Sequence, residues 1–334
     1  MFDNEFGSMN VTIRVLENDL LNQSMYDRLL AADSFEDAVS LLRETTYRDE
    51  VERVLETHNY DEMITEELEE TYRRLFQLSP YPEMVELMTL KYTYQNLKVM
   101  IKEEISEKDF SDLYFNIGRF DLTDLRQAVS LGKSDVLPQA YLETINSAKL
   151  DYSEFNNVHQ VEMLIDRHYF EHLKQLALEI GDPAIINLVD MQIDFKNIST
   201  LIRAKYQNRT PNFLRSILSD AGTFEIEKLI KLGVGDARSL IQSLSETKYK
   251  DVLNESLIVA GIGISSIKFD YYTDNAMMRK MQDAKLKAFG PLPMLSFIYA
   301  KETEARNLRL VLSAKENRID IEETKGRMRL NYVS

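Results

Sequence analysis

The chain has 334 residues, with 55 Asp plus Glu against 40 Lys plus Arg and a formal net charge of −15. An acidic surface repels a polyanion, which disfavours nucleic acid as a partner. The absence of cysteine excludes disulfides and thiolate metal sites, and it is consistent with a cytoplasmic location. The acidic opening, Met1 to Glu5, lacks the apolar core of a signal peptide.

The elements predicted along the chain are helical. Hydrophobic residues make up 44% of the chain and charged residues 28%, with only 11 Gly and 7 Pro, as in a helix-rich globular protein. Apolar residues recur at helical spacing early, over residues 11–21, and again over residues 169–178. No run of alternating β-branched residues between turn dipeptides predicts a strand. The least polar stretch, residues 257–269, is too short to cross a bilayer.

Three stretches share one pattern, in which a proline is followed after thirteen residues by an asparagine. Apolar residues lie in phase at nine and two positions before each asparagine and at one and five positions after it. The three pairs are Pro82 and Asn96, Pro183 and Asn197, and Pro293 and Asn307. We interpret them as a threefold duplication in which each proline begins a helix of about 20 residues.

Two further markers support the repeat. Residues 33–37, 118–122 and 222–226 each place a Phe before an acid, just after a turn-prone pair, and each then begins a helix with apolar periodicity. Residues 44–48 resemble residues 246–250, so this third marker joins only two copies. The predicted units are 10–107, 108–212 and 213–334, each large enough for a small domain.

The repeated asparagines have two interpretations. The in-phase apolar residues form a stripe on one side of each helix, and further apolar residues four positions after each asparagine predict a helix surrounded by others. A buried amide must be satisfied, so each asparagine is expected to bind a neighbouring backbone. The alternative is a ligand ring formed by Asn96, Asn197 and Asn307 about a threefold axis.

The third copy departs from the other two by carrying charge. Lys301 and Glu304 stand where the first two copies have Leu or Met and Thr or Asp, and Arg306 and Arg309 follow. Charge within an apolar seam predicts an exposed or partner-facing edge, so these four residues are candidates for partner binding. A local pair that only stabilises the third unit is the competing interpretation. The ends of the chain also differ in charge: residues 1–110 hold 25 acidic and 11 basic residues, whereas residues 276–334 hold 7 and 12. Two explanations of this difference remain. Either the helix faces are simply solvated and acidic, or the two ends of the chain face differently charged partners.

Signatures of catalysis are scarce. The sequence has neither a phosphate-binding loop ending in Gly-Lys-Ser/Thr nor a Gly-x-Ser-x-Gly elbow, and the fragment Gly261-Ile-Gly263 lacks the third glycine of a dinucleotide site. His168 and His172 are spaced to bind one metal from a helix, but no third ligand is evident, which favours an exposed, metal-free pair.

Longer motifs resemble a known family. The C-terminal part contains Ala284-Lys-Leu-Lys-Ala-Phe-Gly-Pro-Leu-Pro293 and Tyr299-Ala-Lys-Glu-Thr-Glu-Ala-Arg-Asn-Leu-Arg309. The N-terminal part contains Ile13-Arg-Val-Leu-Glu-Asn-Asp-Leu-Leu21, Tyr26-Asp-Arg-Leu-Leu30 and Thr46-Tyr47. Together they resemble the central-stalk socket of rotary V-type and archaeal-type ATPases, which is the C subunit in archaea and bacteria and the d subunit in eukaryotes.

The resemblance implies an all-α funnel of three similar domains about a pseudo-threefold axis. It further implies a non-catalytic subunit, without metal or cofactor, that lies peripherally on the cytoplasmic face of a membrane-embedded rotor ring. There it would receive the shaft of the ATP-hydrolysing head and transmit torque for ion transport. Two alternatives remain: a stand-alone helical-repeat scaffold for soluble partners, and a helical metalloenzyme that uses His168 and His172.

Overall fold

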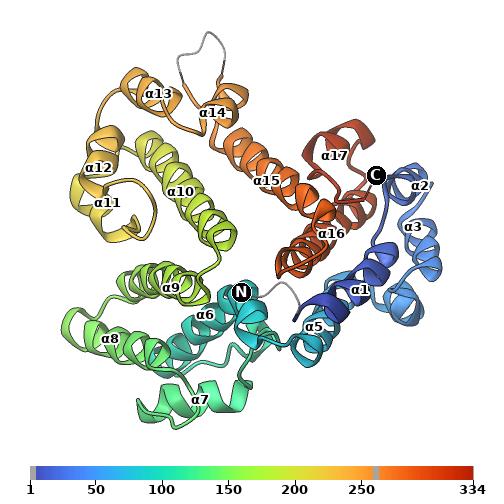
Figure 1. Cartoon of the computed structure of the whole chain (residues 1–334), viewed down its shortest axis with the longest axis horizontal. Helices are drawn as coiled ribbons and strands as arrows, with labels where there is room; N and C mark the ends of the chain where they lie inside the picture. The colour runs from blue at the N-terminus through green and yellow to red at the C-terminus, as the bar shows by residue number, and fades with distance from the viewer. Residues whose placement is uncertain (1–4, 259–262, 334) are drawn as a thin grey trace. The chain divides into compact units, whose positions relative to one another are not determined.

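The computed structural model describes residues 5–258 and 263–333 (Figure 1). All regular elements in these two ranges are helices, and Leu257 and Ile264 form an isolated antiparallel bridge. The all-α prediction is therefore confirmed.

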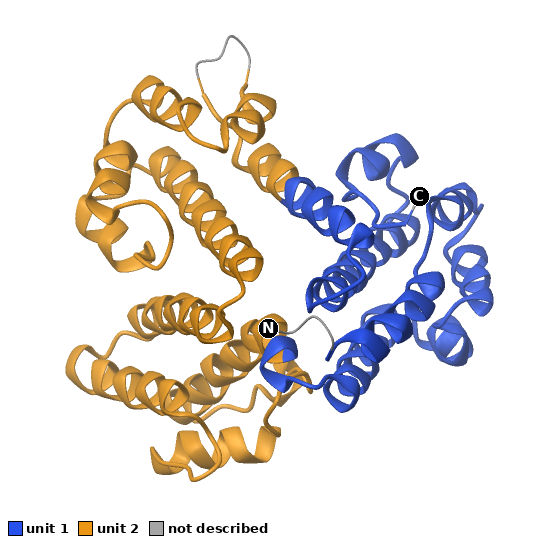
Figure 2. Cartoon of the chain, viewed as in Figure 1, with its two compact units in different colours: residues 1–85, 274–334 blue, residues 86–273 orange. Residues whose placement is uncertain are grey.

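The chain forms two compact units, shown in blue and orange in Figure 2. Unit 1 combines residues 1–85 with residues 274–334, and unit 2 contains residues 86–273. The chain leaves unit 1 within helix α6 (Pro82–Ser106) and returns within α15 (Ser266–Asp283). Unit 1 thus joins the two ends of the sequence, whereas the division into three repeat units stays a prediction.

Unit 1 is built around the long helix α16 (Leu292–Glu316), which packs against helices from the other end of the chain. Its core contains the Phe marker of the first copy, Phe35, beside Ala305 and Leu308 of α16. The N-terminal helices are α1 (Gly7–Leu16), α2 (Gln23–Ala31), α3 (Phe35–Leu41), α4 (Val51–Thr57) and α5 (Tyr60–Leu78), with short 3-10 helices η1 (Glu17–Asp19), η2 (Leu42–Glu44) and η3 (Arg48–Glu50). The C-terminal ones are η6 (Ala284–Leu286) and α17 (Ile321–Arg327).

Unit 2 contains the second long helix, α10 (Pro183–Tyr206), and most of α6. Its N-terminal part also has η4 (Ser111–Leu113), α7 (Leu122–Leu131), α8 (Gln139–Phe155) and α9 (Val158–Ile180). Four shorter helices follow α10, namely α11 (Pro211–Ile217), α12 (Ile226–Val234), α13 (Ala237–Ser245) and α14 (Lys250–Ser256). Helix α12 packs on α10, so the Phe marker at Phe224 again precedes a helix that covers a long helix.

Local sequence sets the ends of these helices. Gly181 ends α9 with a φ of 72°, a left-handed conformation that a residue without Cβ adopts at little cost. Asp182 then caps α10 by accepting hydrogen bonds from the backbone N–H groups of Ala184 and Ile185, and Pro183 occupies the first turn, where its missing N–H leaves no gap. The predicted helix start at Pro183 is therefore confirmed.

The three long helices match the predicted repeat in length and burial. They contain 25, 24 and 25 residues, and the prolines Pro82, Pro183 and Pro293 lie in their first turns. Every in-phase apolar position of the repeat is buried except Leu188, which is half-buried. Buried residues occur around most of α10 and α16, as expected for helices surrounded by others.

Candidate functional site

Each repeated asparagine is bound to the backbone of a single residue about 20 positions further along the chain. The amide nitrogen donates to the carbonyl of that residue, and the amide oxygen accepts from its N–H. The pairs are Asn96 with Phe115 (2.8 and 2.9 Å), Asn197 with Ser219 (2.7 and 3.0 Å) and Asn307 with Arg329 (2.9 and 2.8 Å). The expected side-chain tie to a backbone is present, and the amides use their donors and acceptors inside their own units rather than on a ligand.

A buried carboxylate lies three residues before the asparagine in two of the copies. Asp194 accepts from the backbone N–H of Thr223 at 2.7 Å and from the Tyr249 hydroxyl at 2.6 Å. Glu304 accepts from the N–H of Leu21 at 2.6 Å and from the Tyr47 hydroxyl at 2.8 Å. We call each such arrangement of a long-helix carboxylate, a backbone N–H and a tyrosine hydroxyl a tyrosine clasp.

The clasps explain why the third sequence marker recurs. In residues 44–48 and 246–250, the hydroxyl of Thr45 or Thr247 donates to the carbonyl three residues earlier and accepts from the N–H of Tyr47 or Tyr249 at 3.2 Å. The turn thus aims each tyrosine at its carboxylate. The marker thus lies in the first and third copies, whereas the carboxylates that it meets lie on the long helices of the third and second copies, so spacing within one copy does not predict the contact.

The first copy replaces the clasp with a related pair. Its long helix has Thr93 at the corresponding position, and the buried carboxylate is that of Glu86, one turn into the helix. Glu86 accepts from the Tyr141 hydroxyl at 2.7 Å and pairs with Arg119 at 2.8 Å. A different tyrosine, Tyr141 from α8, therefore makes the corresponding contact to the first long helix, and it belongs to residues 108–212, the unit that lacks the third marker.

Close backbone approach accounts for the glycine before two of the Phe markers. A Cβ at Gly222 would lie 2.6 Å from the Asp194 carboxylate, and one at Gly118 would lie 2.9 Å from the Thr93 hydroxyl. Both glycines thus let the segment pass directly over the position three residues before the asparagine. The same turn therefore closes onto the same point of the first and second long helices.

The third copy adds a lysine to its clasp. The Lys301 ammonium lies 2.8 Å from Glu304 and 2.8 Å from Glu67 of α5, and 5.0 Å from the centre of the Tyr47 ring. Only 3% of Lys301 and 4% of Glu304 is exposed. Burial lowers the pKa of Lys301, but the two carboxylates outweigh it and raise this pKa above its usual value. Burial and the charge of Glu304 raise the pKa of Tyr47, so its hydroxyl stays a donor.

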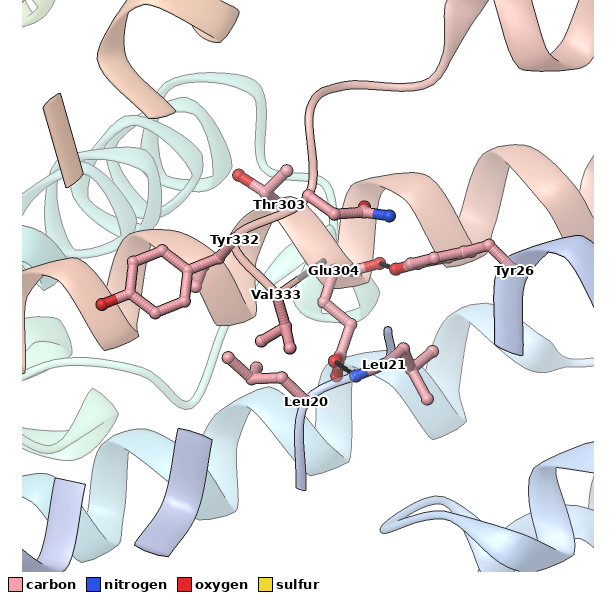
Figure 3. Close-up of a pocket in the computed structure, with 9 residues that line it drawn as sticks. Leu20, Leu21, Tyr26, Thr303, Glu304, Tyr332 and Val333 are labelled. Atoms are coloured by element: carbon pink, nitrogen blue, oxygen red, sulfur yellow. Dashed lines mark hydrogen bonds between the residues drawn. The ribbon is translucent and has the colours of Figure 1, made fainter. Parts of the chain in front are cut away.

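The prediction that Lys301 and Glu304 face a partner is wrong, because both are enclosed by unit 1. Figure 3 shows the Glu304 carboxylate meeting the Leu21 N–H and the Glu304 carbonyl accepting from the Tyr26 hydroxyl, a distance of 3.3 Å. The adjoining cavity has a volume of about 10 Å³, barely enough for one water molecule. The error arose because the compensating groups, Glu67 and Tyr47, come from more than 200 residues away in the sequence.

Arg306 and Arg309 lie closer to solvent. Arg306 is exposed and pairs with Asp274 at 2.6 Å, while Arg309 is half-buried and pairs with Asp61 at 3.0 Å. Both guanidinium groups belong to ion pairs at the surface of unit 1, where such pairs contribute little stability and exchange readily with other partners.

Of the two histidines of α9, His172 is buried in the core of unit 2 and His168 is half-buried. His172 is 8% exposed and its Nδ1 lies 3.1 Å from the Tyr94 hydroxyl, while the Nδ1 of His168 lies 3.1 Å from the Thr144 hydroxyl. The expectation of an exposed pair is therefore wrong for His172. Burial lowers the pKa of both imidazoles. Within the described residues, no three His, Asp or Glu side chains gather as a metal site would require.

Two further sequence features are the glycine fragment and the apolar stretches of the chain. The glycine fragment considered for dinucleotide binding includes Gly261, which lies outside the described residues. Among the helices of the two described ranges, none combines the length and apolarity that crossing a membrane demands.

Comparison with known proteins assigns the chain to a family. The model of the ATP synthase (C/AC39) subunit family matches residues 9–327. The chain belongs to this family. The C subunit of the V-type sodium ATPase of Enterococcus hirae is 28% identical over 98% of this chain and 99% of its own length. The C subunit of the A-type ATP synthase of Methanocaldococcus jannaschii is 20% identical over 96% and 85%, and that of Methanobrevibacter smithii 24% identical over 78% and 72%.

Membership in the C/AC39 family agrees with a structural role for the buried asparagine hydrogen bonds and tyrosine clasps. The family is a non-catalytic structural subunit of rotary V-type and A-type ATPases. Its match over nearly the whole chain favours a component of such a complex over a stand-alone scaffold or a metalloenzyme. The buried clasps and asparagine ties are accordingly structural groups, and their role is to hold the long helices in place.

Proposed function

We propose that this chain is the socket of the central stalk, which links the rotating shaft to the membrane rotor ring and transmits torque for ATP-coupled ion transport. The family match supports membership in the complex, and the relatives bear the names of ATPase and ATP synthase subunits. In this role the chain is a peripheral subunit at the cytoplasmic face of the membrane. Its partners are the shaft subunits and the proteolipid ring.

The observation that carries the proposal is the recurrent bracing of the long helices. Each is bound through its asparagine to a distant backbone, and each also carries a buried carboxylate that accepts from a tyrosine. Breaking one buried, paired group costs about 1–3 kcal/mol, so a load on one helix is shared with its neighbours instead of melting the helix. A subunit that passes torque needs this resistance to local unfolding.

The threefold arrangement is part of the proposal. We assign residues 10–107, 108–212 and 213–334 to three similar helical domains that form a funnel about a pseudo-threefold axis. The common asparagine tie and the two matching clasps support a shared unit. In the structure, however, a Phe marker lies with the long helix of a different copy. The helix after the third marker packs on α10 of the second copy, and Phe35 of the first marker shares a core with α16 of the third copy. An experimental structure of the assembled complex tests this arrangement by superposition of the three units.

Arg306 and Arg309 remain the candidates for partner binding. Their guanidinium groups reach the surface, and their present partners, Asp274 and Asp61, are acidic groups that a partner's carboxylates can replace. We expect Arg306→Glu with Arg309→Glu to weaken assembly while leaving the helical content unchanged. Normal assembly of the double variant would remove both residues from the interface.

Binding to the two proposed partners tests the function directly. The purified chain should form complexes both with isolated shaft subunits, measured by gel filtration, and with ring-containing membranes stripped of the native protein, measured by sedimentation. Binding to neither would contradict the proposed socket. Binding to one alone would reduce the role to that of a shaft or ring accessory.

A further inference from the structure

An apolar surface on unit 1 is formed by helix α1 and the segment that precedes the third long helix. Leu286 is 89% exposed and Phe289 60%, while Val11 and Val15 of α1 are 68% and 59% exposed. We call these four residues, together with Lys287, the α1 edge patch. It contains some of the most exposed large apolar side chains of the described residues.

Hydrogen bonds hold the segment in place on α1. Arg14 donates to the carbonyls of residues 284, 285 and 287 at 3.5, 3.0 and 2.9 Å, and Asn10 donates to those of residues 288 and 290 at 3.2 and 3.1 Å. Gly290 ends the segment with a φ of 78°, a conformation that favours glycine. The carbonyls therefore turn towards α1, and the segment is ordered before any partner binds, which lowers the entropy cost of docking.

The valines extend the surface along α1. Val11 and Val15 lie about one turn apart on α1, and each directly follows one of the two clamping residues, Asn10 and Arg14. The α1 sequence, Gly7–Leu16, contains no acidic residue. The patch thus combines exposed apolar side chains with a helix that carries no acidic residue.

The segment that precedes the third long helix is basic, as is the C-terminal part of the chain, whereas η1, directly after α1, carries the acidic Glu17 and Asp19. Residues 279–289 include one acidic residue, Asp283, and four exposed basic ones, namely Arg279, Lys280, Lys285 and Lys287. Lys285 is held at one edge, with its ammonium 4.3 Å from the centre of the Tyr332 ring and bonded to the Tyr332 carbonyl. Lys285 and Lys287 flank Leu286, and Phe289 lies two residues further on, which suits a surface that offers both apolar and anionic groups.

We propose that the α1 edge patch docks the chain onto the membrane-embedded rotor ring. The inference rests on the proposed function and chooses between its two partners. Backbone carbonyls already satisfied by Arg14 and Asn10 tolerate removal from water. Lysines next to exposed apolar side chains match the level of lipid headgroups, where the ring emerges from the membrane. The occupant is an apolar surface of the ring that carries carboxylates or bound lipid phosphates.

Binding of the full-length chain to stripped, ring-containing membranes tests the proposal. The variant Leu286→Ser with Phe289→Ser should lose at least about tenfold in affinity for these membranes, because exposed apolar anchors dominate such contacts. Lys287→Glu should also weaken binding and should make it less sensitive to salt. Ile267→Ser is the matched control, since Ile267 is 81% exposed but lies in unit 2, and it should bind as the unaltered chain does.

Two parallel measurements separate the alternatives. Binding of the double serine variant to isolated shaft subunits should equal that of the unaltered chain, and protein-free vesicles of the same lipids should bind the unaltered chain weakly. Unchanged membrane binding by both patch variants would overturn the proposal, as would selective loss of shaft binding or equally tight binding to bare vesicles. If the unaltered chain binds neither ring nor shaft, the proposed function fails and this inference fails with it.

Discussion

Replacing Lys301 by Met tests whether the third long helix depends on its buried charge cluster. The substitution is informative because the second copy has Met191 at this position and still buries a carboxylate, Asp194. There the hydroxyl of Thr223 supplies a further donor, at 2.5 Å, to the carboxylate that Tyr249 also contacts. In the third copy the Lys301 ammonium donates to Glu304 at 2.8 Å and so takes the place of that threonine hydroxyl.

The expected cost follows from what the variant leaves behind. Removing one member of a buried ion pair costs about 3–5 kcal/mol, because the remaining charge is uncompensated. Glu67 is partly exposed and can turn to water, whereas Glu304 keeps the Leu21 N–H and the Tyr47 hydroxyl. We therefore expect the lower end, a loss of about 3 kcal/mol in the free energy of unfolding of unit 1.

Urea unfolding followed by circular dichroism measures this effect. The matched control is Lys325→Met, which removes an exposed ion pair with Glu322 and should change stability by less than about 0.5 kcal/mol. An equally small change for Lys301→Met at neutral pH would refute the reasoning, since it would mean that Glu304 does not need the ammonium. A double variant, Lys301→Met with Glu304→Gln, should recover part of the loss because it leaves no buried charge.

Two further predictions concern unit 2. Asn197→Leu should destabilise the chain by about 1–3 kcal/mol, because the N–H and carbonyl of Ser219 lose their buried partner, and an unchanged thermal melting curve would contradict this. Stability should fall as the pH drops below about 6.5, since burial lowers the pKa of His172 and the unfolded chain then binds the proton first. His172→Asn, whose amide oxygen can still accept from Tyr94, should flatten this decrease in a series of urea titrations, whereas the exposed His159→Asn should leave it as steep as before.

The sequence predicted the repeated features and missed those formed by distant partners. The prolines, the in-phase apolar residues and the asparagines obey local rules of helix geometry and of polar burial, so their roles followed from spacing alone. The tyrosine clasps did not, because Tyr47 and Glu304 are brought together by the closure of the two ends of the chain into unit 1.

The burial of charged side chains could not be predicted from the sequence either. A lysine is rarely enclosed without partners, so the sequence predicts Lys301 to lie at the surface. Its partner Glu67 lies in one of the most acidic stretches of the chain, and nothing in the sequence distinguishes it from its solvated neighbours. The burial of His172 was missed for the same reason: its hydrogen-bond partner, the Tyr94 hydroxyl, comes from a different helix.

The central claim is that this chain couples the rotation of the shaft to the ring. The most direct measurement compares ATP hydrolysis with ATP-driven ion transport in membranes that contain the reconstituted complex, with and without this chain. We predict that hydrolysis by the head continues without the chain, that ion transport stops, and that adding the purified chain restores transport. Ion transport at an undiminished ratio to hydrolysis in the complex that lacks the chain would contradict this claim.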